Sequence, residues 1–379
     1  PPLGDESVKP RTSLTTRLDG QMGRTVDYTP LLAAPPEAEV REFRRRARAL
    51  GLPGTLLAPG TLVQVVVVLP LALIGGSIFF GAAATAILGR VDSALPAFVG
   101  ALLVGAVAVV GIGAIIVLMG RRKRVRWAQL NRFALVNGLE FSPHSAAPSY
   151  PGSIFKIGSS RASIEHFRSA DGRFLDFGNY QYTTGSGKNR RVQRWGFLAL
   201  HLDRRLPHMV LDSRANNGLF GASNLPTTFD RSQRLRLEGD FDRHFTLYCP
   251  ARYETDALYV FTPDLMALLI DEAAPFDVEI IDDWLFVYHP GGFESGSPAV
   301  YQRLLRIADT VGAKTLDQTE RYRDERVADA LAVNLVAPAG QRLRRGLPLP
   351  AIIGLVAVAL VWILGIVPDL LGSLFSLRP

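Results

Sequence analysis

Three residues in the second half of the chain have types and a spacing that could do chemistry. Asp240, Asp242 and His244 alternate within residues 239–244, and alternate residues of a strand point to the same face of a sheet. Two carboxylates and an imidazole on one face could bind a divalent cation, or an aspartate could orient the imidazole for acid–base catalysis. A polar strand entry, neutralised by Arg243, accounts for the same pattern. We keep these residues as a candidate site, while the leading expectation assigns no catalytic, cofactor-binding or metal-binding residue.

Other motifs that suggest chemistry lack the required spacing. A phosphate-binding loop needs Gly, four residues, Gly-Lys and then Ser or Thr. Around residues 185–188, however, Tyr182 stands where the first Gly belongs and Asn189 follows the lysine. None of the six histidines belongs to a helical His-x-x-x-His pair of the kind that binds zinc. The single cysteine, Cys249, excludes an intramolecular disulfide and fits a reducing compartment.

The elements around these residues include three long apolar segments. Residues 62–89, 95–120 and 349–367 carry almost no charge, and about 20 apolar residues of helix are enough to cross a bilayer. We therefore expect three transmembrane α-helices, of which the first two form a helical hairpin over residues 62–120.

Basic residues flank these segments and predict their orientation. Lys and Arg beside a span stay on the cytoplasmic side, and all of the basic clusters share one side if the N-terminus and the main domain are cytoplasmic. The same side chains could hold anionic lipid headgroups, which accounts for the net charge of +7 without nucleic acid. We expect a multi-pass protein of the bacterial inner (plasma) membrane. The membrane-edge clusters are Arg44, Arg45, Arg46, Arg121, Arg122, Lys123, Arg124, Arg342, Arg344 and Arg345.

Composition divides the rest of the chain. Residues 1–35 are polar and contain Pro and Gly, which predicts a disordered or loosely attached arm. Residues 36–51 predict a basic amphipathic helix, because apolar residues recur at helical spacing among arginines. Residues 127–340 are numerous enough to bury an independent core and predict a cytoplasmic domain. Residues 368–379 would form an external tail.

Hairpin signals dominate the predicted cytoplasmic domain. Two strand-like runs, 163–167 and 174–182, flank Asp171-Gly172, a dipeptide typical of tight turns. Hairpins, rather than strand–helix–strand units, predict an α+β domain with a mostly antiparallel sheet and argue against a doubly wound nucleotide-binding fold. The other expected pairs are 174–183 with 192–202, and 276–281 with 284–289 across Asp282-Asp283.

Several segments resemble known sequences. Phe177-Gly-Asn-Tyr-Gln-Tyr182, Arg194-Trp-Gly-Phe197 and residues 237–248 are similar to stretches of uncharacterised actinobacterial multi-pass membrane proteins. Residues 253–266 resemble a wider bacterial family, a domain of unknown function that also sits beside predicted spans. The resemblance implies the same architecture. It implies no activity, so no functional residue is transferred.

Two classes of function fit these observations. The first is a membrane-anchored cytoplasmic interaction or scaffold module, an accessory subunit of a bacterial membrane complex, which binds a protein partner or a second copy and performs no catalysis. The alternative is an inner-leaflet lipid-binding domain, or a hydrolytic enzyme with its site near Asp240, Asp242 and His244. A pocket with convergent polar groups would favour the alternative, and a filled core with an exposed apolar patch would favour the first.

Overall fold

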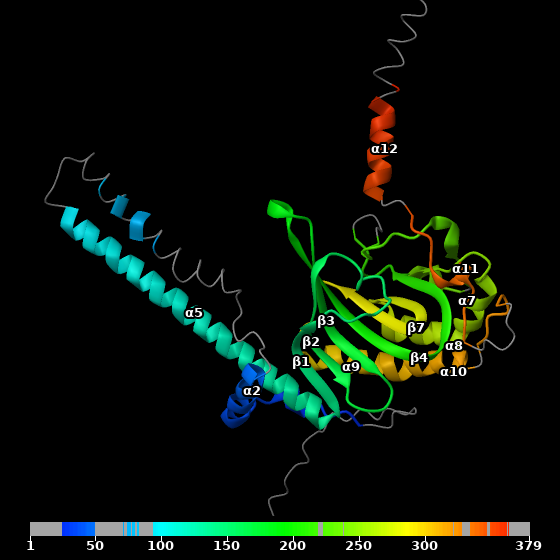
Figure 1. The fold of residues 1–379 in the computed structure, drawn as a ribbon, viewed down its shortest axis with the longest axis horizontal. Coiled ribbons are helices and arrows are strands. Elements are labelled where there is room, and N and C mark those ends of the chain that lie inside the picture. Colours follow the sequence, from blue (N-terminus) through cyan, green and yellow to red (C-terminus); the bar gives the residue numbers. More distant parts are fainter. Residues whose placement is uncertain are drawn as a thin grey trace, which may run out of the picture. The chain divides into compact units, whose positions relative to one another are not determined.

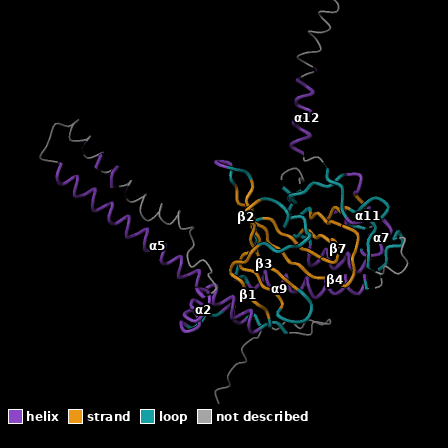
Figure 2. The backbone as a smooth tube through the Cα atoms, viewed as in Figure 1, coloured by secondary structure: helices purple, strands orange, loops and turns teal. Residues whose placement is uncertain are grey.

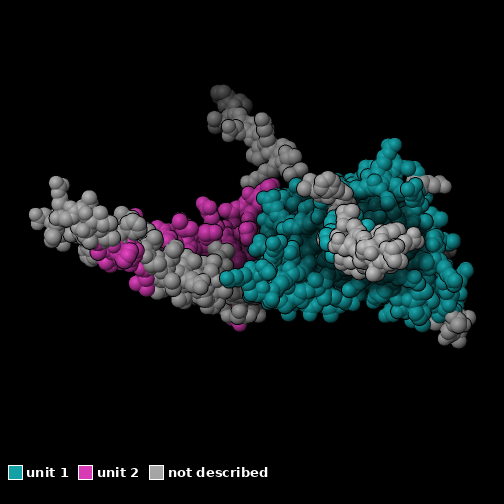
Figure 3. Space-filling model, turned by 90° about the horizontal axis from the view of Figure 1, so that it is seen from above, with its two compact units in different colours: residues 1–28, 134–379 teal, residues 29–133 magenta. Residues whose placement is uncertain are grey.

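The computed structural model describes residues 25–49, 94–218, 223–237, 239–320, 322–327, 334–346, 349–361 and 363, with isolated positions between 71 and 82. The chain divides into two compact units (Figure 3). One contains residues 29–133, and the other contains residues 1–28 and 134–379. The predicted external tail, 368–379, lies outside the described residues.

The unit of residues 29–133 is helical in its described part. It contains α1 (Thr29–Leu32), α2 (Glu37–Ala49) and most of α5 (Ala94–Val136). The acidic residues Glu37 and Glu39 lie in the first turn of α2, where they complement the positive end of the helix dipole. Exposed i,i+4 ion pairs, such as Arg46 with Glu42 at 2.6 Å, add only a few tenths of a kcal/mol each.

The structure corrects the predicted fold class. Among the described residues, no helix has both the length and the apolar character needed to cross a membrane, so the expectation of three transmembrane α-helices is wrong there. Helix α12 covers Leu349–Val361 in the described part of the chain. Helix α5 does not end at its apolar boundary, because it continues through the basic residues 121–126 to Val136. The predicted span 62–89 lies largely outside the described residues.

A seven-stranded antiparallel sheet forms the centre of the second unit and confirms the antiparallel part of the prediction (Figure 1). The strand order is β1-β2-β3-β4-β6-β5. Strands β3 and β6 pair with different stretches of one edge of β4, and β7 pairs with the opposite edge. Figure 2 shows how these strands gather in one body. The strands are β1 (Leu139–Ala146), β2 (Ser159–Ser169), β3 (Leu175–Thr184), β4 (Arg191–Ser213), β5 (Arg234–Leu235), β6 (Phe245–Tyr248) and β7 (Asp277–Pro290).

The hairpin of 174–183 with 192–202 is present as β3 and β4, with Tyr180 opposite Trp195. The hairpin across Asp282-Asp283 is absent, because β7 runs through both residues as one strand and pairs with β4 on either side of them. Asp282 has a φ of +55° at this irregularity. Two aspartates that resemble a turn therefore mark a local bulge in a long strand.

Helices cover one face of the sheet, and a loop covers the other. Tyr301 of α9 (Pro298–Ile307) packs edge-on against Phe167 at 5.2 Å between ring centroids. On the opposite face Phe155 and its loop pack into an aromatic cluster with Phe197 and Phe286. The other helical elements among the described residues of this unit include η3 (Gly187–Asn189), η5 (Arg231–Gln233), α6 (Phe241–His244), α7 (Glu254–Val260), α8 (Pro263–Leu268), η6 (Leu269–Ala273), η7 (Ala308–Gly312), α10 (Ala313–Thr319) and α11 (Pro338–Gln341).

Candidate functional site

The candidate residues Asp240, Asp242 and His244 do not lie on a strand. Asp242 and His244 belong to the short helix α6, and Asp240 precedes it. Residues two apart on a helix do not face each other, so the alternation that motivated the site is wrong. The pattern has a packing cause, since Phe241 and Phe245 are both buried with ring centroids 5.1 Å apart. Among the described residues, no group of three His, Cys, Asp or Glu side chains could hold a metal ion.

The basic clusters are mostly solvent-exposed. Arg44, Arg45 and Arg46 are exposed on α2, and Arg121 and Arg122 are exposed on α5. On the same helix the Lys123 ammonium lies 4.5 Å from the centroid of the Trp127 ring, and Arg124 is partly buried. The last cluster, Arg342, Arg344 and Arg345, is exposed within the sheet unit, where Arg342 forms a bidentate pair with Asp282 at 2.9 Å.

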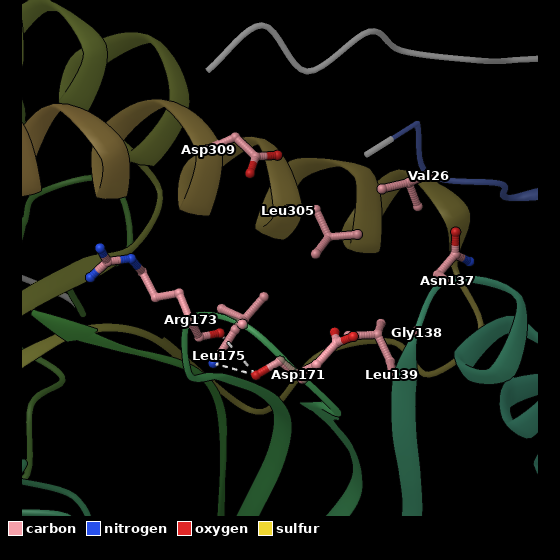
Figure 4. Close-up of a pocket in the computed structure, with 11 residues that line it drawn as sticks. Val26, Asn137, Gly138, Leu139, Asp171, Arg173, Leu175, Leu305 and Asp309 are labelled. Carbon is pink, nitrogen blue, oxygen red and sulfur yellow. Dashed lines mark hydrogen bonds between the residues drawn. The ribbon is translucent and has the colours of Figure 1, made fainter. Parts of the chain in front are cut away.

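A cavity of about 390 Å³ lies in the sheet unit between the α9 side and the first strands (Figure 4). Leu305 projects from α9 on one side, and Leu175 of β3 lies on the other. This volume is within the range of small-molecule sites. The lining residues are Val26, Asn137, Gly138, Leu139, Ser169, Asp171, Gly172, Arg173, Leu175, Leu305 and Asp309.

Local sequence chemistry shapes the walls of this cavity. Gly138 has a φ of +62° and lies two residues after Val136, the last residue of α5, a left-handed conformation that commonly ends a helix. The neighbouring Asn137 amide accepts from the backbone N–H of Asp27 at 2.7 Å and donates to its carbonyl at 3.0 Å. These two hydrogen bonds hold the segment that carries Val26 in place. On the other side Ser169 Oγ donates to the carbonyl of Arg173 at 3.0 Å and closes the hairpin turn.

Asp309 is the notable polar group of the cavity. Its Oδ2 atom is buried and has no hydrogen-bond partner among the described residues. Burial raises the pKa of Asp309 to about 6, because a desolvated carboxylate is costly when charged. Burial, followed by the charge of Asp309, also raises the pKa of Tyr28 to about 12. Asp309 therefore lines the cavity and carries one buried oxygen that makes no hydrogen bond among the described residues.

The charges that line the cavity are not balanced. Asp171 and Asp309 contribute two carboxyl groups, and Arg173 contributes the cavity's one guanidinium. That guanidinium is already paired with Asp203, through bonds of 3.0 and 3.1 Å. The lining therefore holds more carboxyl groups than guanidinium groups.

A second polar array joins the neighbouring strands β1, β2 and β3. Ser145 Oγ lies 2.6 Å from His166 Nε2, and His166 Nδ1 lies 2.8 Å from Asp176 Oδ1. The other oxygen of Asp176 accepts from Tyr150 OH at 2.6 Å and from Arg168 at 3.2 Å. Asp176 is fully buried, and both of its carboxylate oxygens accept hydrogen bonds from within the protein.

A third buried network holds the centre of the sheet. Glu279 accepts from His208 Nε2 at 2.8 Å, from Tyr288 OH at 2.8 Å and from the backbone N–H of Ser153 at 2.8 Å. His208 Nδ1 accepts the N–H of Leu343 at 3.0 Å, which assigns the ring proton to Nε2. Glu279 and both ring nitrogens of His208 have hydrogen-bond partners within the protein, so we assign this network a structural role.

Neither the cavity nor the array at Ser145 was predicted from the sequence. One signal for the cavity was present: Asp309 lies four residues after Leu305, on the same side of the helix as apolar residues that are buried. A signal for the array was also present, since His166 and Asp176 lie on the two arms of the predicted hairpin around Asp171-Gly172. Neither signal involves a recognised motif.

Comparison with known proteins identifies no family. No family model matches the chain, and no curated protein matches it. One solved structure is similar, the crystal structure of the mycobacterial trehalose monomycolate transport factor A, TtfA, with 12% sequence identity and a TM-score of 0.34, covering 50% of this chain and 92% of that chain. At this TM-score the similarity supports no argument about fold or function. The resemblance to actinobacterial membrane proteins stays a prediction.

Proposed function

We propose that the sheet unit is a binding module, and that its cavity takes an apolar ligand carrying one cationic hydrogen-bond donor, such as an alkylammonium group. The observation that carries the proposal is Asp309, a residue that lines the cavity and whose buried Oδ2 atom has no hydrogen-bond partner in the described part of the chain. A bound ammonium would pair with this oxygen. The apolar remainder of the ligand would contact Leu139, Leu175 and Leu305.

Two free-energy terms favour such a ligand. The ligand's own apolar surface, once removed from water, contributes about 25 cal/mol per Å². Leu175 and Leu305 form the wall that it contacts, and they are already buried without it, at 3% and 7% exposed. A charged hydrogen bond is worth about 1.5–3 kcal/mol. An anionic ligand would meet Asp309 and Asp171 and would bind more weakly.

Thermal denaturation of the full chain with octylamine tests this proposal. A ligand that binds only the folded state stabilises it by about 2.7 kcal/mol at a hundredfold excess over its dissociation constant. Leu305→Trp should fill the cavity and abolish the rise in melting temperature that octylamine causes. Leu258→Trp is the matched control, because Leu258 is 53% exposed on α7. An equal shift in both variants, or no shift in the wild type, would refute the proposal.

A second proposal concerns the unit of residues 29–133. We propose that this unit docks at an anionic membrane surface, the cytoplasmic face of the bacterial inner membrane. The protein would then be an interaction or scaffold module of a membrane complex. Helix α5 supports it, because exposed apolar residues precede the exposed Arg121 and Arg122. A hollow of about 470 Å³ on this helix is lined by Leu118, Arg121, Arg122, Val125, Arg126 and Gln129. The exposed apolar residues are Val107, Val110, Ile115, Val117, Leu118 and Met119.

Vesicle co-sedimentation tests the second proposal. Each basic side chain near an anionic surface contributes about 1 kcal/mol, so Arg121→Glu with Arg122→Glu should greatly reduce binding to vesicles that contain phosphatidylglycerol. Lys314→Glu, on α10, is the control and should leave binding unchanged. Equal binding to phosphatidylcholine vesicles, or binding that salt does not weaken, would contradict an electrostatic dock.

A further inference from the structure

The array of Ser145, His166 and Asp176 has the connectivity of a nucleophile, a general base and an orienting carboxylate. We propose that Ser145 is an activated nucleophile that attacks carboxylic esters, an activity beyond the binding function proposed above. The two contacts, 2.6 Å from Ser145 Oγ to His166 Nε2 and 2.8 Å from His166 Nδ1 to Asp176 Oδ1, fall within the range required for such a relay. The expectation of a protein without catalysis did not include this arrangement.

The surrounding bonds set the proton positions that the relay needs. Burial acts to raise the pKa of Asp176, but hydrogen bonds from His166 and Tyr150 and the charge of Arg168 lower it below its ordinary value. The carboxylate is therefore ionised and accepts the proton on His166 Nδ1. His166 Nε2 then presents a lone pair to the Ser145 hydroxyl, as a general base must. Burial and the neighbouring Asp176 raise the pKa of Tyr150, which keeps the phenol protonated and donating.

The backbone is bent where it positions the histidine. Glu165 has a φ of +47°, and the β2–β3 register shifts between Ile164 and Phe167. Opposite this bulge lies Gly178, where an added Cβ would come within 2.5 Å of His166 Cα. A side chain at Gly178 would displace the histidine. Bulges of this kind often redirect a side chain beside a functional site.

Two side chains of β2 each have a buried polar atom that makes no hydrogen bond among the described residues. Ser163 is directly opposite Ser145 in the β1–β2 register and is 1% exposed. Its Oγ atom and the Nε atom of Arg168 are both buried, and neither has a hydrogen-bond partner among the described residues. A carbonyl oxygen that becomes an anion during attack by Ser145 needs such donors. We assign this stabilising role to Ser163, which lies opposite Ser145.

The reaction follows from these positions. Ser145 is partly exposed on the edge strand β1. Its Oγ forms a bond to the ester carbonyl carbon as its proton passes to His166 Nε2. The tetrahedral oxyanion then collapses, the bond between carbon and the leaving oxygen breaks, and that oxygen takes the proton from Nε2. Water repeats the sequence on the acyl-serine, which releases a carboxylic acid and restores the Ser145 hydroxyl.

Labelling of the full chain with a fluorophosphonate probe tests the proposal. The Ser145 oxygen would bond to phosphorus, the phosphorus–fluorine bond would break, and fluoride would leave as His166 takes the proton. We expect one label per chain, mapped to Ser145 by peptide mass spectrometry. Ser145→Ala should abolish it, and His166→Gln should slow it by about a hundredfold or more, the range for loss of a general base.

Ser142→Ala is the matched control, because Ser142 lies on the same strand and is also partly exposed. It should keep the wild-type rate of labelling, and Ser145→Ala should keep the wild-type melting temperature within a few degrees. Wild-type protein that remains unlabelled would overturn the proposal. So would a label that persists in Ser145→Ala, or one that disappears in Ser142→Ala.

Discussion

Replacing Asp309 with asparagine should stabilise the free protein above pH 6 and weaken its ligand binding at the same time. Burial raises the pKa of the folded-state carboxyl from 3.8 to about 6, and each pKa unit corresponds to about 1.36 kcal/mol. The difference amounts to about 3 kcal/mol, which we reduce to about 2 kcal/mol because the residue is partly exposed. The unfolded chain ionises first, so this group lowers stability as pH rises from about 4 to about 6, and the full cost remains above pH 6.

Urea unfolding between pH 4 and pH 8 measures this effect. Asp309→Asn should be about 2 kcal/mol more stable than the wild type at pH 8, and the two should have nearly the same stability at pH 4. Asp317→Asn is the control, since Asp317 is exposed on α10 and surface changes stay within about 0.5 kcal/mol. A constant difference between wild type and Asp309→Asn at all pH values would refute the assignment of a buried, unpaired carboxyl.

Three other substitutions or additions have defined outcomes. Trp195→Ala should cost about 3–5 kcal/mol by thermal melting, because Trp195 is 5% exposed in the aromatic cluster, while Val192→Ala at a 55% exposed position should change little. Asp277→Asn should stabilise the protein by about 4 kcal/mol in urea unfolding at pH 8 and not at pH 4, because burial, with the nearby Asp212 charge, raises the Asp277 pKa to about 7; an unchanged pH profile would contradict this. Magnesium, manganese, calcium and zinc should give no thermal shift that depends on His244, and a shift lost in His244→Gln would restore the metal site.

The antiparallel sheet was predictable because hairpins are local. Alternating runs around Asp171-Gly172, and the pairing of 174–183 with 192–202, depend on residues that are close in sequence. The irregular part of the sheet was not predictable in this way. Asp282 takes a φ of +55° inside β7, and only the partner strand β4, more than 60 residues earlier in the chain, shows that it is a bulge and not a turn.

The functional features escaped prediction for a related reason. Asp309 gains its raised pKa from burial, which sequence spacing does not report. Ser145, His166 and Asp176 come from three strands, and the bulge at Glu165 is needed to bring the histidine to the serine. The alternation of Asp240 and His244 was visible, but the burial of Phe241 in a helical turn produced it.

Titration calorimetry of octylamine and octanoate into the full chain at pH 8 tests the central claim most directly, because the two ligands share an apolar chain and differ in the sign of their charge. The cavity at Asp309 should bind the amine at least tenfold more tightly than the carboxylate, a difference of about 1.4 kcal/mol or more. In Asp309→Asn most of this difference should disappear. Equal affinity of the wild type for both ligands, or a preference that Asp309→Asn retains in full, would contradict the account.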